Sequence, residues 1–224
     1  MTEELEDYID AHIEPEPRHL LRLERRTNLR LVNGRMCSGH LQGRLLKMLV
    51  RMIRPQKVLE LGTFSGYSAL CMAEGLMPEG KIVTLEAVDE LEDFIRENLS
   101  DAGEPGEKVE LRIGPALQTM AGMPDASFDL IFMDADKREY PAYFREAMRL
   151  TVPGGFIIAD NTLWDGHVAD PDRNDPQTAG IKNFNDLVAS DPRCETVILP
   201  VRDGLTLIYK KPAPLNSAPT LSVI

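Results

Sequence analysis

The sequence predicts an α/β protein whose sheet is mostly parallel and carries helices on both faces. From Lys57 onward, short apolar or β-branched runs alternate with helix-like segments, which is the pattern of βαβ units. Near the end of the chain, Arg202-Asp203-Gly204 joins two further apolar runs, and Asp-Gly between two strands is a strong hairpin signal. The sheet is therefore expected to end in an antiparallel pair.

The elements are expected in a regular order. Residues 1–55 look helical, with breaks near Pro15, Pro17 and Asn33-Gly34. Five strands should follow, at Val58–Leu61, Lys81–Glu86, Val109–Ile113, Phe128–Met133 and Phe156–Asp160. The helix-like segments between them lie at about 66–77, 88–102, 115–121 and 140–151. A further helix at 178–190 precedes the two last strands, at Glu195–Val201 and Leu205–Lys210.

The length of 224 residues suits one large domain. We expect a single domain over residues 1–211, made of a helical N-terminal region (1–55) and an α/β core (56–211). Residues 212–224 carry three prolines and few charges, and are expected to form a loose tail.

Charge and cysteine usage argue against several classes of function. Acidic residues outnumber basic ones by 36 to 25, so the net charge is −11, which argues against a nucleic-acid surface. The apolar runs are too short to cross a membrane, and the N-terminus, MTEELEDYID, has no apolar signal region. Cys37, Cys71 and Cys194 are widely spaced and form no CxxC pair, as is usual for reduced thiols. We therefore expect a cytoplasmic protein with a small-molecule partner.

The loop after the first strand, Glu60 to Ser68 (ELGTFSGYS), has the features of a ligand-binding turn. Glycine at such a strand–helix junction permits a tight turn and a close approach of the backbone to a ligand. A dinucleotide fingerprint that starts at Gly62 would need glycine at the positions of Phe64 and Tyr67, which weakens the prediction of NAD binding. A tight turn without a ligand remains the alternative.

Glu86 ends the second strand, 24 residues after Gly62. An acidic residue about 20 residues past a glycine loop is well placed to accept hydrogen bonds from ribose hydroxyls. The alternative is an exposed carboxylate that caps the following helix.

Acidic and amide side chains close the next two central strands. Asp134-Ala-Asp136 ends the fourth strand and Asp160-Asn161 ends the fifth. Two carboxylates and an amide oxygen at adjacent strand ends suit a hard cation such as Mg²⁺, with positions left for water or substrate. The alternative is that these carboxylates are helix caps and ion-pair partners.

Two groups of basic residues have competing interpretations. Lys137 lies one short loop from the expected cation, and a nearby cation would favour the neutral amine that a general base needs; the alternative is a surface lysine. An arginine recurs at every fourth position and forms one helix face, either solvated or dimer-facing, or a site for substrate phosphates. The residues of this face are Arg18, Arg22, Arg26 and Arg30.

Taken in order, VLELGTFSGYSAL, GPAL, DADK and DNTLWDG resemble the motifs of the cation-dependent class I O-methyltransferases, which use S-adenosylmethionine. The likeness is greater to the caffeoyl-CoA and bacterial small-molecule branch than to catechol O-methyltransferase, and it covers about residues 5–211. It implies a Rossmann-like, doubly wound, seven-stranded sheet with an antiparallel last strand and extra N-terminal helices.

The resemblance also implies roles for individual residues. The implied contacts to S-adenosylmethionine are Ser38, Glu60, Gly62, Thr63, Ser68, Glu86, Ala116, Asp134 and Asp136. The implied ligands of Mg²⁺ (or Mn²⁺ or Ca²⁺) are Asp134, Asp160 and Asn161. Lys137 matches the lysine proposed as the base, and the implied substrate contacts are Lys137, Asn161 and Asp165. We align Val197 with a glutamate that clamps the second hydroxyl in the catechol enzyme, so the acceptor stays open.

The expected activity is methyl transfer to a hydroxyl of a catechol-like (vicinal dihydroxy) aromatic molecule. A homodimer is expected, because the N-terminal helices have few strands to pack upon and related enzymes of this branch are commonly dimers. Two alternatives are kept. One is an NAD-dependent oxidoreductase, disfavoured by Phe64 and Tyr67, and the other is a cofactor-binding protein without catalysis, disfavoured by the intact acidic set.

Overall fold

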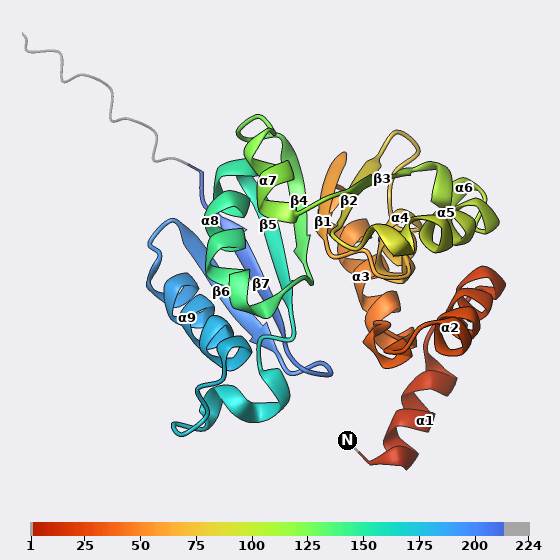
Figure 1. Ribbon diagram of the computed structural model, residues 1–224, viewed down its shortest axis with the longest axis horizontal. Helices are drawn as coiled ribbons and strands as arrows, with labels where there is room; N and C mark the ends of the chain where they lie inside the picture. Colours follow the sequence, from red (N-terminus) through yellow and green to blue (C-terminus); the bar gives the residue numbers. More distant parts are fainter. Residues whose placement is uncertain (1, 213–224) are drawn as a thin grey trace, which may run out of the picture.

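The computed structural model describes residues 2–212, and within them one sheet has the strand order β3-β2-β1-β4-β5-β7-β6 (Figure 1). The strands are β1 (Lys57–Leu61), β2 (Lys81–Glu86), β3 (Val109–Ile113), β4 (Phe128–Met133), β5 (Thr151–Asp160), β6 (Cys194–Leu199) and β7 (Leu205–Lys210). Strands β1 to β5 pair in parallel, whereas β7 runs antiparallel to both of its neighbours, β5 and β6. The predicted sheet, mostly parallel with a reversed last strand, is confirmed.

Helices cover both faces of this sheet. The α-helices are α1 (Glu3–His12), α2 (Arg18–Arg30), α3 (His40–Ile53), α4 (Tyr67–Ala73), α5 (Glu92–Asp101), α6 (Glu104–Glu107), α7 (Ala116–Ala121), α8 (Tyr140–Leu150) and α9 (Pro176–Ser190). Short 3₁₀ turns are η1 (Gly34–Met36), η2 (Asp89–Leu91), η3 (Lys137–Glu139) and η4 (Trp164–Ala169). Within the described residues, no helix is long and apolar enough to cross a membrane.

Alternation along the strands explains the two layers. In β4, Ile131 and Met133 join the core beneath α7, α8 and α9, whereas Leu130 and Phe132 join the core beneath α3 and α4. Successive side chains of a strand point to opposite faces, so a central strand that is covered on both sides is mostly apolar. This is why the central strands read as short continuous apolar runs in the sequence.

The N-terminal helices pack beside the core, next to α3 and α5 (Figure 1). Leu20 and Leu23 of α2 are buried in a cluster with residues of α4 and α5. On the basic face of α2, Arg26 lies 2.8 Å from Asp101 and Arg30 lies 2.7 Å from Glu97, both on α5. Part of this arginine face is therefore a contact within the chain.

Strand β5 begins at Thr151, five residues before the predicted start at Phe156. The first half of the strand contains Pro153-Gly154-Gly155, and the sequence does not predict it as strand because proline and glycine usually mark a turn. Gly154 has φ +85°, and the register to β4 shifts at this point, which is the signature of a bulge. The predicted tail lies, except for Pro212, outside the described residues.

Candidate active site

A cavity of about 900 Å³ opens at the carboxyl ends of the parallel strands. Its walls come from the turns after β1, β2, β4 and β5, from the start of α7, and from the segment between α2 and α3. A volume of this size is at the upper end of the range for small-molecule and cofactor sites. Open α/β sheets bind ligands at this edge, where the sequence placed its candidate residues.

The glycine loop after β1 can be built only with glycine at its first turn. Gly62 has φ +92°, and a Cβ atom at this position would come within 2.1 Å of the carbonyl oxygen of Asp134, at the end of the neighbouring strand β4. Phe64 also has a positive φ (51°), although it carries a side chain, so the loop holds backbone strain. Strain of this kind is typical of a ligand-binding turn.

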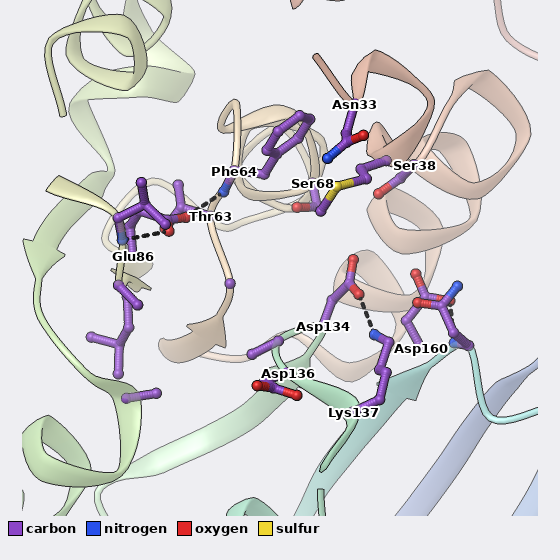
Figure 2. Close-up of a pocket in the computed structure, with 18 of the residues that line it drawn as sticks. Asn33, Ser38, Thr63, Phe64, Ser68, Glu86, Asp134, Asp136, Lys137 and Asp160 are labelled. Carbon is purple, nitrogen blue, oxygen red and sulfur yellow. Dashed lines mark hydrogen bonds and ion pairs between the residues drawn. The ribbon is translucent and has the colours of Figure 1, made fainter. Parts of the chain in front are cut away.

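Glu86 holds this loop to the end of β2. Its carboxylate accepts one hydrogen bond from the backbone N–H of Phe64 (2.7 Å; Figure 2) and another from that of Val88 (2.9 Å). The side chain is buried but lines the cavity. An ionised carboxylate has about four acceptor positions, so Glu86 keeps capacity for hydroxyl groups of a ligand.

Glu60 lies behind the cavity wall. It is completely buried and accepts hydrogen bonds from the hydroxyls of Ser68 (2.6 Å) and Thr84 (2.5 Å). Burial raises the pKa of Glu60 to about 8, although these two hydrogen bonds act in the opposite direction. Ser68, not Glu60, reaches the cavity, so the structure places the sequence-predicted acid one layer behind the surface that it was expected to form.

Asp134 and Asp160 meet at the ends of the adjacent strands β4 and β5, with Lys137 beside them (Figure 2). The ammonium of Lys137 lies 2.7 Å from Asp134 Oδ1 and 2.7 Å from the hydroxyl of Tyr140. Burial, together with the nearby charge of Asp134, raises the pKa of Asp160 to about 6. Burial alone would lower the pKa of Lys137, but the charges of Asp134 and Tyr140 and the hydrogen bonds to both of them together outweigh burial, so the pKa of Lys137 stands well above its usual value.

The predicted cation ligands are two carboxylates and one amide, all of which line the cavity: Asp134, Asp160 and Asn161. Over residues 2–212, no cluster of three or more His, Cys, Asp or Glu side chains could hold a metal, and the predicted set has two carboxylates with an amide as its third member. Its oxygen-only chemistry fits Mg²⁺ or Mn²⁺. The fit is supported by the two carboxylates, which lie close enough for one to raise the pKa of the other.

The remaining predicted residues are divided between the cavity and its surroundings. The cavity lining contains Ser38, Gly62, Thr63, Ala116 and Asp136. Asp165 is not part of that lining, and its backbone N–H donates a hydrogen bond to the Asp203 carboxylate. Val197 lies on β6, also away from the lining, and is 50% exposed.

Arg202 is a cavity residue that sequence reasoning missed. It lies in the turn between β6 and β7, has φ +48°, and donates hydrogen bonds to the carbonyl oxygens of Cys37 (3.2 Å) and Ser38. The signal was available in the topology. Because β6 runs in the same direction as β5, the turn that follows β6 lies at the same sheet edge as the other site loops.

Comparison with known proteins agrees with this geometry. A family model described as O-methyltransferase matches residues 10–211. The chain is 34% identical to a catechol O-methyltransferase of Niastella koreensis over 76% of this chain and 80% of that protein. It is 36% identical to a caffeoyl-CoA O-methyltransferase of Petroselinum crispum over 74% of this chain and 73% of that protein.

A solved structure gives the same result for the fold and the cofactor. The O-methyltransferase from Bacillus cereus, in complex with SAH, superposes with a TM-score of 0.82 and 34% identity, over 93% of this chain and 97% of that one. These findings decide against the NAD-dependent oxidoreductase and the non-catalytic binding protein that the sequence left open. The chain therefore belongs to the O-methyltransferase family, as an S-adenosylmethionine-dependent enzyme of the caffeoyl-CoA and catechol type.

Proposed function

We propose that this enzyme methylates a hydroxyl of a vicinal dihydroxy aromatic molecule, and that the reaction depends on a divalent cation held by Asp134, Asp160 and Asn161. The observation that carries the proposal is the meeting of two carboxylates and Lys137 in the cavity that also contains the glycine loop. Methyl donor, acceptor and base can thus be held within one site.

The cofactor is proposed to lie along the glycine loop. Glu86 would accept hydrogen bonds from the ribose hydroxyls, and Ala116, at the start of α7, would contact the adenine. The methionine half would lie against Ser38, Gly62, Thr63 and Ser68, with Asp134 and Asp136 as further contacts. Glu60 would act indirectly in this arrangement, by holding the hydroxyl of Ser68 from behind.

The acceptor is proposed to lie beside Asn161 and Lys137. A divalent cation on the three ligands would supply positive charge that lowers the pKa of the acceptor hydroxyl. Lys137 would accept the hydroxyl proton at Nζ. It can do so only as the neutral amine, so Asp134 would have to stabilise the ammonium form of Lys137 less than it does in this structure. Asp165 lies outside the cavity lining, in η4, and would contact the acceptor from that loop. The displacement needs little further chemistry, so alignment supplies much of the rate.

The test is turnover of a catechol panel with S-adenosylmethionine before and after chelation. EDTA should remove nearly all activity, and Mg²⁺ or Mn²⁺ should restore it, because an uncharged catechol hydroxyl is a poor nucleophile. Ca²⁺ should restore less, since its longer and looser coordination misplaces the acceptor. Full turnover in EDTA would mean that the carboxylates are only structural.

Further proposals concern the setting of the enzyme. We propose that residues 1–211 form one domain, that the partner is a small molecule and not a nucleic acid, and that the enzyme works in the cytoplasm, which the free thiols of all three cysteines support.

We propose a homodimer, supported by the exposed apolar side chains of Met48 (53%) and Met52 (72%) on α3. Light scattering should give twice the 25.0 kDa mass of the chain, and a monomer mass would reject this proposal.

A further inference from the structure

Asp160 is a buried carboxylate whose two oxygens are held from different parts of the chain. Oδ1 accepts a hydrogen bond from the backbone N–H of Asn161 (2.7 Å). Oδ2 accepts one from the side-chain amide of Gln42, a residue of α3 that lies 118 positions earlier in the sequence. Both side chains are almost fully buried, Asp160 at 3% and Gln42 at 1% exposure.

Asp160 depends on this amide because nearby charge does not compensate it directly. Lys137 forms its ion pair with Asp134, and no ion pair to Asp160 is present within residues 2–212. A buried anion without an ion pair must be stabilised by hydrogen bonds, and hydrogen bonds to a charged group are the stronger ones. Gln42 supplies the side-chain donor.

The helix that carries Gln42 is fixed against the sheet. Leu46 and Val50, one and two turns further along α3, are buried in the core with Leu130 and Phe132 of β4. Residues four apart share one face of a helix, so the packing that anchors Leu46 also directs Gln42 inward. The amide therefore reaches Asp160 from a rigid element, which a positioning role requires.

We propose that Gln42 is a positioning residue that fixes the orientation of the Asp160 carboxylate for divalent-cation binding. This inference rests on the proposed role of Asp160 as a cation ligand. With Oδ2 held by the amide, the carboxylate cannot rotate freely, and Asp160 lines the cavity. Residues that orient a metal ligand typically strengthen metal affinity about 10- to 100-fold.

The same contact gives the N-terminal helical region a share in the cation site. Ser38 lines the cavity just before α3 begins, and Gln42 holds a cation ligand from the first turns of α3. A short stretch outside the strand–helix core would thus serve both the cofactor and the cation.

The test is the affinity of the purified enzyme for Mn²⁺, followed by the EPR signal of the free ion. Gln42→Met removes the donor and keeps a side chain of similar length, and it should weaken Mn²⁺ binding about 10- to 100-fold. SAH affinity, measured by calorimetry, should stay at the wild-type value. Gln42→Asn, which withdraws the amide by one methylene and stays polar, should weaken Mn²⁺ binding in the same direction and serves if the methionine variant does not fold.

Asn98→Leu is the matched control. Asn98 is also 1% exposed, and its amide donates to the carbonyl oxygen of Ser65 (3.0 Å) in the glycine loop. The Asn98→Leu substitution removes a buried amide near the same cavity, and Asn98 does not contact Asp160, so Mn²⁺ affinity should not change.

Two results would overturn the inference alone: wild-type Mn²⁺ affinity in folded Gln42 variants while Asp160→Ala loses the ion, or an equal loss in Asn98→Leu. If Asp160→Ala binds Mn²⁺ as well as the wild type, the proposed cation site itself is wrong, and the inference falls with it.

Discussion

Among single residues, Glu86 makes the most direct link between the cofactor loop and the sheet. Its carboxylate is fixed by two backbone N–H groups, so it is oriented before a ligand arrives. Glu86→Ala should weaken S-adenosylmethionine binding by about 1.5–3 kcal/mol, because a hydrogen-bond acceptor with a full charge is lost. Calorimetry measures this. Glu90→Ala, at an exposed position on η2, should have no effect, and equal affinities in the two variants would reject the ribose role of Glu86.

Glu60 should give the stability of the protein a pH dependence. Its pKa is about 8 in the folded chain and near 4.5 in the unfolded one, so the folded state binds the extra proton between these values. Stability therefore falls as the pH rises from the unfolded to the folded pKa, and is flat above it. Glu60→Gln removes this loss, so its stability relative to the wild type should rise between about pH 5 and about pH 8. Urea unfolding at both values tests it, and a constant difference would show that Glu60 titrates normally.

For single residues, the sequence could predict which side chains gather at the site, but not which of them line the cavity and which are buried behind its wall. The spacing of Glu86 from Gly62 and the strand-end acids correctly led to cavity residues. Glu60 and Ser68 occur in the same motif, yet only the packed structure shows that one of them lies behind the other. Gln42 carried no sequence signal, because its partner is remote in the chain and an amide on a helix is usually a surface residue.

Among the elements, the loop after β5 depends on the hairpin for its shape. The N–H of Thr162 donates to the carbonyl of Gly204 (3.1 Å) and that of Leu163 to the carbonyl of Asp203 (2.9 Å). A Cβ atom at Gly204, where φ is +90°, would come within 2.5 Å of Leu163. The hairpin turn therefore fits the cation-site loop only if this position is glycine.

Gly204→Ala should destabilise the fold and weaken Mn²⁺ binding, because the loop that carries Asn161 must move. Gly166→Ala is the control: Gly166 also has a positive φ (77°), but an added Cβ would meet nothing within 4 Å. Backbone strain alone costs of order 1–3 kcal/mol, so both variants should lose some stability, and Gly204→Ala clearly more. Urea unfolding and Mn²⁺ titration measure the two effects, and equal losses would show that contact with Leu163 is unimportant.

Element boundaries were predictable where one apolar pattern filled the element. Strands β2, β3, β4 and β7 have their predicted bounds, since each is a compact run between turn residues. The first half of β5 was missed because its bulge contains proline and glycine, and the four-residue helix α6 because Pro105-Gly106 reads as a turn. In both cases the local sequence favours a turn, and contacts with the rest of the fold hold the segment in a strand or a helix instead.

For the whole molecule, the succession of strands along the chain and the antiparallel last strand could be predicted, but the docking of the N-terminal region could not. The βαβ pattern and the Asp-Gly turn fix the sheet, whereas the helices before β1 are attached by pairs that no local pattern reveals. Besides the apolar contacts of α2 and its ion pairs with α5, the attachment includes a cluster of ionic side chains: Glu14 before α2, Arg44 and Lys47 on α3, and Glu74 after α4. It joins the region that contains Ser38 and Gln42 to the α/β core.

Glu74 should be the most important member of this cluster. Its side chain is only 9% exposed, and it lies 2.9 Å from Arg44 and 3.2 Å from Lys47, both buried. Glu74→Gln would leave two buried cations poorly compensated, and breaking a buried pair costs about 3–5 kcal/mol. Glu14→Gln is the matched change, since Glu14 contacts the same two cations but is 54% exposed, and an exposed pair contributes about 0–1 kcal/mol. In urea unfolding, the loss in free energy of unfolding should therefore be several-fold larger for Glu74→Gln than for Glu14→Gln. SAH affinity should fall with Glu74→Gln as well, because the segment that carries Ser38 would loosen. If both variants lose the same small amount, the N-terminal region is held by its apolar contacts, and the buried charges do not attach it to the core.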